Sequence, residues 1–188
     1  NIRLISTMAD RMASISKHLR NFARRPMDRT GPVPMLAVVK DALDLMGPRL
    51  QAAGAHLVYD PPKAEIWVTG GRVRLQQVIV NLIGNALDAM EGAEAPAITM
   101  TVGAKDGRCW LSVQDRGPGL SEEALAQAFD PFFTTKPPGQ GLGLGLSISY
   151  NIVRDFNGRL TAANRDGGGA VFTIELDLTD PPSDMAAE

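Results

Sequence analysis

The sequence predicts an α+β fold, a two-layer α/β sandwich in which helices cover a sheet, preceded by one long helix. Short segments rich in β-branched and apolar residues are bounded by Gly- and Pro-containing turns, as is typical of strands. Longer segments with apolar residues at helical spacing lie between them. The expected strands are His56–Tyr59, Glu65–Val68, Ile98–Gly103, Arg108–Gln114, Gly158–Asn164 and Ala170–Leu178.

Three helices are expected among these strands. The first, Met35–Ala53, has apolar residues at steps of three and four, although Gly47-Pro48 should interrupt or kink it. The second is Arg72–Met90, and the third is Leu142–Phe156. Both of these helices are amphipathic, so we expect them to cover one face of the sheet.

The first 25 residues carry a separate helical pattern. Their apolar residues repeat at steps of three and four, namely Ile5, Met8, Met12, Ile15, Leu19 and Phe22. Such a seam predicts pairing with another helix, and a second copy of the chain is the expected partner. We therefore divide the chain into a dimerisation helix (1–25), a Pro- and Gly-rich linker (26–33), a main domain (34–178) and a flexible tail (179–188).

Composition excludes several classes of protein. The 188 residues include 21 acidic and 19 basic side chains, so nucleic-acid binding is not expected. The single cysteine, Cys109, excludes an internal disulfide and favours a reducing compartment. Its place in an apolar strand predicts a buried, inert thiol. The sequence has no apolar run of membrane-spanning length and no visible signal peptide, so no membrane contact is expected of this segment.

A stripe of polar residues runs along the second predicted helix. Gln77, Asn81, Asn85 and Asp88 follow at steps of four, four and three, so they share one face. Asparagine is a poor helix former, which suggests that a function keeps Asn81 and Asn85 there. Carboxamide oxygens are hard ligands suited to Mg²⁺. Taken alone, the stripe is equally compatible with a solvated outer face.

Two glycine-containing segments follow. Asp115-Arg-Gly117-Pro-Gly119 comes directly after a strand, where a carboxylate can accept a hydrogen bond from an exocyclic amine such as that of adenine, although an ordinary Asp-Gly turn has the same pattern. Glycines 139, 141, 143 and 145 then run into the third helix. Bare N–H groups at a helix N-terminus are a phosphate site, but a glycine run alone is also typical of a flexible loop.

Together and in this order, these segments and the intervening Phe129–Lys136 resemble the N, G1, F and G2 boxes of sensor histidine kinases. These kinases share their ATP-binding domain with gyrase, Hsp90 and MutL. The resemblance covers roughly residues 34–178 and implies the Bergerat fold, with a mixed, mainly antiparallel sheet. Competing motifs are absent: the sequence has no Gly-Lys-Ser/Thr, and its glycine spacing does not fit G-x-G-x-x-G. The segment Arg11–Pro26 looks most like kinases of the C4-dicarboxylate sensor type.

The resemblance implies roles for individual residues. Asn85 would ligate Mg²⁺, Asn81 would contact the ATP phosphates, and Asp115 would bind the adenine amino group. Residues 116–140 would form the ATP lid, with Phe132 and Phe133 as packing anchors and Lys136 reaching a phosphate, so that Asn81 and Lys136 are the catalytic candidates. Further nucleotide contacts are expected from Asp88, Gly117, Gly119, Phe133, Thr134, Thr135, Gly141, Leu142, Gly143, Leu144, Gly145 and Thr173.

The same resemblance favours a kinase over a hydrolase. ATP-hydrolysing relatives carry a glutamate where this chain has Asn81, and an amide cannot act as a general base. We therefore expect transfer of the ATP γ-phosphate to a histidine and relay to a response-regulator aspartate. His18 has no acidic neighbour and His56 lies in a predicted strand, so neither fits the phosphoacceptor.

The acceptor histidine is expected on a helix outside this sequence, in the same or a partner subunit. The chain should then bind Mg-ATP without phosphorylating itself, as the cytoplasmic part of a bacterial inner-membrane sensor. The alternative from another class is a non-catalytic nucleotide-binding switch module of the same fold. An anti-sigma kinase that targets serine is a weaker alternative, because the N-terminal seam argues against it.

Overall fold

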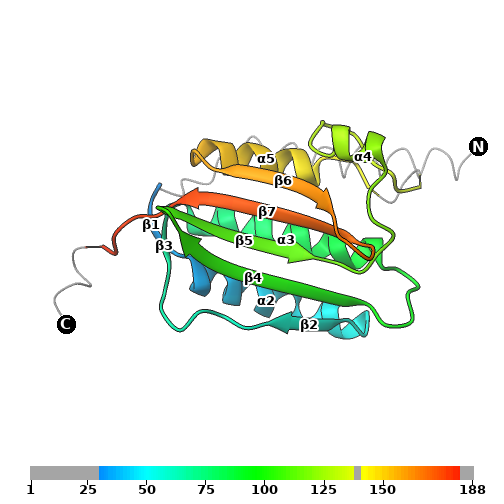
Figure 1. The fold of residues 1–188 in the computed structure, drawn as a ribbon, viewed down its shortest axis with the longest axis horizontal. Coiled ribbons are helices and arrows are strands. Elements are labelled where there is room, and N and C mark those ends of the chain that lie inside the picture. Colours follow the sequence, from blue (N-terminus) through cyan, green and yellow to red (C-terminus); the bar gives the residue numbers. More distant parts are fainter. Residues whose placement is uncertain (1–29, 138–140, 183–188) are drawn as a thin grey trace, which may run out of the picture.

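The computed structural model describes residues 30–137 and 141–182, which form a sheet covered on one face by helices (Figure 1). The elements are β1 (Gly31–Pro34), α2 (Met35–Ala52), β2 (His56–Tyr59), β3 (Trp67–Gly70), α3 (Arg72–Ala89), β4 (Ala97–Lys105), β5 (Arg108–Gln114), α4 (Glu122–Gln127), α5 (Gly145–Asp155), β6 (Arg159–Asn164) and β7 (Ala170–Asp177). The α+β prediction is confirmed.

The main sheet has five strands in the order β2-β4-β5-β7-β6. Only the β2–β4 pair is parallel, and the other pairs are antiparallel, so the sheet is mixed and mainly antiparallel as the resemblance implied. The β4–β5 connection is the turn Asp106-Gly107, in which both residues have positive φ, 53° and 78°. This pair of left-handed residues is typical of two-residue hairpins, because its twist matches that of the strands.

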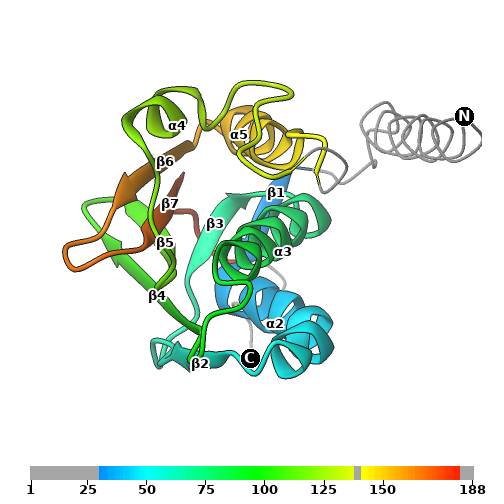
Figure 2. The same ribbon diagram turned by 90° about the vertical axis from the view of Figure 1, so that its right-hand side faces the viewer.

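The helices α2, α3 and α5 lie side by side on one face of the sheet, with α3 in the middle (Figure 2). The apolar positions of α3 recur at steps of three and four, and this face is completely buried at Leu75, Val78, Ile79, Leu82 and Ile83. Each such side chain stabilises the fold by about 1.5–3 kcal/mol on burial. The opposing sheet residues are equally buried; they include Ile98, Leu111 and Ile174. The polar residues of α3 lie outside this buried face, and we call the strip formed by Gln77, Asn81, Asn85 and Asp88 the polar edge of α3.

Three local predictions were wrong. Residues 31–33, the end of the expected linker, form β1 together with Pro34, and β1 pairs antiparallel with β3 in a separate two-stranded sheet. The strand expected at Glu65–Val68 is β3, which begins at Trp67 and ends at Gly70. Of the interruption or kink expected at Gly47-Pro48, the interruption is contradicted, because α2 continues through Pro48 to Ala52. Met46 and Leu50 are both buried on either side of Pro48, so burial of this face offsets the lost backbone hydrogen bond.

The predicted dimerisation helix and its seam, as well as the end of the tail, lie outside the described residues. Within residues 30–137 and 141–182, no helix combines the length and hydropathy needed to cross a membrane.

Candidate functional site

The middle of α3 meets the N-terminus of α5. The Asn81 side-chain amide donates a hydrogen bond from Nδ2 to Ser149 Oγ at 2.9 Å, which links the two helices. Gly145 is the first residue of α5, and a Cβ placed on it would lie only 2.4 Å from Asn81 Oδ1. Glycine is therefore required at this position for the two helices to approach so closely.

This approach brings the first N–H groups of α5 to the polar edge of α3. The N-terminal N–H groups of a helix have no carbonyl partner within the helix, and the helix dipole adds positive potential there. The arrangement suits an anion such as a phosphate. Gly143 precedes it with a φ of +64°, and its carbonyl accepts a hydrogen bond from the Phe132 amide at 2.9 Å, so the glycine segment and the lid are tied together.

Asp115 lies at the end of β5 and is only 2 % exposed. Its Oδ1 accepts hydrogen bonds from the amides of Gly117 at 2.8 Å and Ala170 at 3.2 Å. Its carbonyl oxygen accepts another from Arg165 Nη1 at 2.7 Å. Because the described hydrogen bonds of the carboxylate all end on Oδ1, Oδ2 keeps its acceptor capacity. The buried aspartate can therefore recognise an amino group.

Glycines allow the Asp115 loop to pack against its neighbours. A Cβ on Gly117 would lie 2.9 Å from the carbonyl oxygen of Ala89, at the C-terminal end of α3. Gly119 and Gly169 have positive φ angles of +81° and +91°. A Cβ placed on Gly169 would lie only 2.1 Å from the carbonyl oxygen of Asp115. The Asp115 loop thus lies at one end of α3, about eight residues or about 12 Å along the helix from Asn81.

Between these two ends, α3 carries Asn85 and Asp88. Asn85 is half-buried and lies one turn from each of Asn81 and Asp88 on the polar edge. Among the described residues, no group of three or more His, Cys, Asp or Glu side chains could hold a metal ion. A single carboxamide oxygen fits Mg²⁺ when phosphate oxygens and waters supply the other ligands, because Mg²⁺ is commonly bound through few protein groups.

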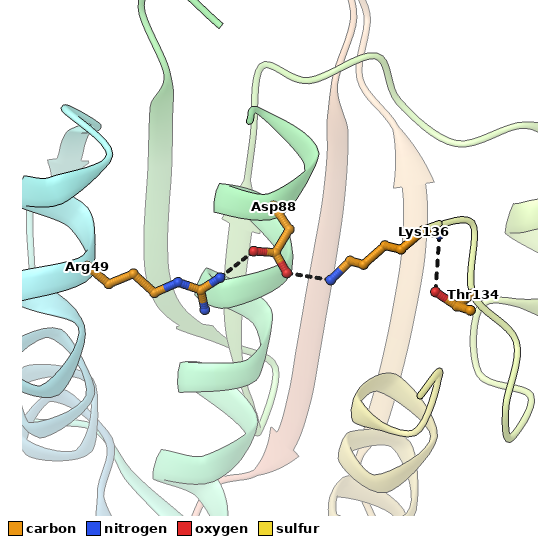
Figure 3. Close-up of polar contacts among 4 residues, drawn as sticks. All are labelled: Arg49, Asp88, Thr134 and Lys136. Atoms are coloured by element: carbon orange, nitrogen blue, oxygen red, sulfur yellow. Dashed lines mark hydrogen bonds and ion pairs between the residues drawn. The ribbon is translucent and has the colours of Figure 1, made fainter. Parts of the chain in front are cut away.

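Asp88 lies between two cations (Figure 3). Its Oδ1 pairs with Arg49 Nη2 from α2, and its Oδ2 pairs with Lys136 Nζ from the lid. Thr134 contributes to the same turn of the lid, since its Oγ1 accepts a hydrogen bond from the Lys136 amide at 3.2 Å. The structure therefore places Lys136 at the polar edge of α3, next to the turn that carries Asn85.

The predicted lid includes a short helix that sequence analysis missed, α4. Its N-terminus is capped by Ser121, whose Oγ accepts a hydrogen bond from the Ala124 amide at 3.1 Å. Asn164 of β6 bonds both the amide and the carbonyl of Leu120, at 2.7 Å each. These contacts attach the first part of the lid to the edge of the sheet.

The aromatic residues of the lid differ in their packing. Phe129 stacks on Tyr150 of α5, with ring centroids 5.1 Å apart. Phe133 is half-buried, but Phe132 is 66 % exposed and has a φ of +68°, so the expectation that Phe132 is a packing anchor was wrong. The Phe132 backbone makes the contact with Gly143, and this turn directs its side chain outwards.

Some of the predicted site residues lie away from the polar edge of α3 and the Asp115 loop. Thr173 lies in register with Ser112 and Thr161, and it alternates with the buried Phe172 and Ile174, so it is on the sheet face opposite the helices. The expected contact of Thr173 with the nucleotide was wrong, because strand alternation turns its side chain away from the helices. Gly141 and Thr135 are exposed, and Leu142 and Leu144 are half-buried. Gly139 lies outside the described residues.

Sequence reasoning also missed several contributors, namely Arg49, Ser149, Arg165 and Gly169. Ser149 follows Gly145 by one helical turn, so helical spacing from the glycine segment was a signal for it. The other three meet their partners only through tertiary packing.

Comparison with known proteins identifies the family. Residues 70–180, more than half of the chain, match the model of the histidine kinase-, DNA gyrase B- and HSP90-like ATPases. The C4-dicarboxylate transport sensor protein DctB of Pseudomonas aeruginosa is 41% identical over 177 residues, covering 94% of this chain but 29% of DctB. The chain thus spans less than a third of the length of this relative.

Solved structures share the fold. The catalytic domain of histidine kinase ThkA is 29% identical with a TM-score of 0.71, covering 79% of this chain and 95% of that one. ThkA in complex with the response regulator protein TrrA is 25% identical with a TM-score of 0.75, and the match covers 94% of this chain and 50% of that one. Full-length ShkA in complex with AMPPNP is 27% identical with a TM-score of 0.76, and the match covers 94% of this chain and 38% of ShkA. The chain belongs to the histidine kinase-, gyrase B- and HSP90-like ATPase family, as an ATP-binding catalytic domain of the sensor histidine kinase type that resembles C4-dicarboxylate sensors.

Proposed function

We propose that the chain binds Mg-ATP along the polar edge of α3 and transfers the γ-phosphate to a histidine on a separate helix. The observation that carries this proposal is the arrangement at the two ends of that edge. Asn81 and the N-terminus of α5 offer an anion site at one end, and the buried Asp115 offers an acceptor for adenine at the other. An extended nucleoside triphosphate can bridge them.

Each residue then has a definite task. Asp115 Oδ2 accepts a hydrogen bond from the adenine amino group, and Gly117 lets the base approach the backbone. The α5 amides and the Asn81 amide bind the phosphates. Asn85 holds Mg²⁺, which, when bound, neutralises charge that develops on the transferred phosphoryl group.

The chemistry favours transfer to an external nucleophile. The Asn81 amide donates to Ser149 and cannot take a proton from water at neutral pH, so it is not a general base for hydrolysis. Catalysis would rest on positioning and electrostatics, with the attacking imidazole supplied by a histidine helix of the same or a partner subunit. The complex of ThkA with a response regulator supports a receiver domain as the subsequent partner.

Two further parts of the proposal concern the whole protein. The N-terminal seam, residues 5–22, would pair two copies of the chain. Since neither His18 nor His56 fits the acceptor, this chain alone would bind Mg-ATP without becoming phosphorylated.

Nucleotide binding is tested by isothermal titration with a non-hydrolysable ATP analogue, with and without Mg²⁺, for the chain and for Asp115→Asn. Asparagine keeps an oxygen for the Gly117 and Ala170 amides but replaces the free acceptor by a donor. We expect Mg²⁺-dependent binding that is about 10- to 100-fold weaker in Asp115→Asn. Asp41→Asn, which changes a carboxylate on α2, is the matched control and should bind like the unchanged chain.

The kinase reaction is tested separately. The chain is mixed with γ-labelled ATP and a histidine hairpin of the C4-dicarboxylate sensor type supplied in trans. Label on the hairpin histidine supports the kinase. Nucleotide binding without transfer to this hairpin favours the alternative, a non-catalytic switch module. Equal affinity in Asp115→Asn would contradict the proposed site.

A further inference from the structure

Three charged side chains from distant parts of the sequence meet beside the proposed phosphate-binding edge. Asp88 at the C-terminal end of α3 pairs with Arg49 on one side and with Lys136 on the other. Figure 3 shows that Arg49 and Lys136 approach the Asp88 carboxylate from opposite sides. Asp88 follows Asn85 by three residues, so the Lys136 ammonium is held beside the turn that carries the proposed Mg²⁺ ligand.

Glycines make room for both cations. A Cβ on Gly84, one turn before Asp88, would lie 3.0 Å from Arg49 Nη1. A Cβ on Gly141, in the glycine segment, would lie 3.3 Å from Lys136 Cδ. The Arg49 guanidinium therefore lies against bare helix backbone, and the stem of Lys136 passes close to the glycine segment that leads into α5.

The charge of Asp88 argues against direct contact with the nucleotide. A carboxylate repels a triphosphate, but here it is flanked by two cations, so the three side chains together carry one net positive charge. An ammonium group has three donors, and Lys136 can contact Asp88 with one of them while others remain for phosphate oxygens.

We propose that Asp88 is a positioning residue that holds Lys136 beside the turn of α3 that carries Asn85, the proposed Mg²⁺ ligand, and that Arg49 orients Asp88 for this task. The inference deepens the proposed function and rests on it. The side chains of Arg49, Asp88 and Lys136 are 52%, 30% and 33% exposed, so these pairs contribute little to global stability. Their effect lies in preorganising the lid, because a lysine already held in place loses less conformational freedom when phosphate binds.

The test is a double-mutant cycle on the affinity for Mg²⁺ and a non-hydrolysable ATP analogue. It compares the unchanged chain, Asp88→Asn, Lys136→Met and the double variant. We expect Asp88→Asn, made alone, to weaken nucleotide binding about three- to tenfold. When Lys136 is already replaced by Met, Asp88→Asn should weaken binding less than about twofold, because the carboxylate acts through the lysine. In Lys136→Arg, which keeps a cation, Asp88→Asn should again weaken binding. Unchanged or tighter binding in Asp88→Asn, or equal losses in all backgrounds, would overturn the inference.

Asp41→Asn is the matched control. The Asp41 carboxylate on α2 likewise pairs with an arginine of α3, Arg72, but this pair lies at the other end of α3 and away from the lid. This variant should leave the affinity unchanged. A second readout needs no nucleotide: amide hydrogen exchange of residues 130–136 should be faster in Asp88→Asn and unchanged in Asp41→Asn. If the unchanged chain binds no nucleotide, the proposed function fails, and lid exchange alone decides the inference: faster exchange supports it, and unchanged exchange overturns it.

Discussion

Gly145 has no room for a side chain, because its ideal Cβ position lies 2.4 Å from Asn81 Oδ1. Helix propensity alone would favour alanine here by about 1 kcal/mol. The steric conflict is larger, since overpacking of this kind costs about 1–3 kcal/mol and displaces the side chain it meets. The displaced group is the amide that we assign to phosphate binding.

We therefore expect Gly145→Ala to lower both stability and affinity for the Mg²⁺-bound ATP analogue. Urea unfolding measures the first effect and calorimetric titration the second. Gly84→Ala, which also replaces a helical glycine but should raise stability, distinguishes this steric effect from a general response to removing a glycine from a helix. A Gly145→Ala variant that is more stable than the unchanged chain would contradict the close contact.

Cys109 is the other residue whose environment makes a definite prediction. Burial, with a smaller contribution from the charge of Glu65, raises the pKa of its thiol to about 12. The native thiol thus stays protonated where an unfolded thiol, with a pKa of about 8.5, has already ionised. Between these pH values the folded state binds more protons, so this contribution to stability is fully present below about pH 8.5 and is lost as pH rises towards 12.

Alkylation by iodoacetamide between pH 7 and 10 checks this prediction. The native chain should react slowly and without the ordinary thiol titration, because the thiolate is the nucleophile. The same chain unfolded in urea is the control and should titrate near pH 8.5. A native titration near that pH would show that the thiol is accessible.

At the scale of elements, α3 combines two tasks on two faces. Its apolar face is completely buried, while its polar edge carries Asn81, Asn85 and Asp88. Asparagine in a helix interior costs helix propensity, and packing of the opposite face offsets that cost. The poor helix formers can therefore be retained where a ligand needs them.

Gly84 lies in the middle of α3, and its Cβ position meets only the end of the flexible Arg49 side chain, at 3.0 Å. We expect Gly84→Ala to stabilise the domain by about 0.5–1 kcal/mol, because alanine loses less backbone entropy in a helix. Urea unfolding measures this. If Arg49 has to move, the lid amides at 130–136 should also exchange faster, as in Asp88→Asn. A loss of stability would mean that Arg49 cannot yield.

At the scale of the whole molecule, the proposed site joins α3 to four other regions. These are α2 through Arg49, the lid through Lys136, α5 through Gly145 and the end of β5 through Asp115. A ligand bound along this edge contacts several of them only when all are folded. Binding should therefore stabilise the domain as a unit.

We expect a saturating ATP analogue with Mg²⁺ to raise the melting temperature. At a ligand concentration of about 100 times Kd, the free energy of unfolding rises by about 2.7 kcal/mol. For a domain of this size, this amounts to an increase of several degrees. Differential scanning calorimetry measures the shift, which should be smaller with EDTA and in Asp115→Asn. An equal shift in Asp115→Asn would place the ligand elsewhere.

Sequence reasoning succeeded where the signal is local. The bounds of α3 were predicted to within one residue and those of β5 without error, because a helical period and a strand between turn residues are read within a single segment. It failed for β1, which depends on pairing with β3, and for Pro48, which is retained in α2 by burial of its neighbours. Thr173 was misplaced because its role was carried over from the family resemblance without following strand alternation to the sheet face.

The sequence by itself determined the fold class, the family and the polar residues of α3, since these depend on periodicity and on motifs in a fixed order. Only the tertiary structure decided which side chains meet. Asn81 and Ser149 are 68 positions apart, and Asp88 lies 39 positions from Arg49 and 48 from Lys136. No local pattern encodes such contacts, because they exist only after helices and lid pack against the same edge of α3 and bring the groups within bonding distance.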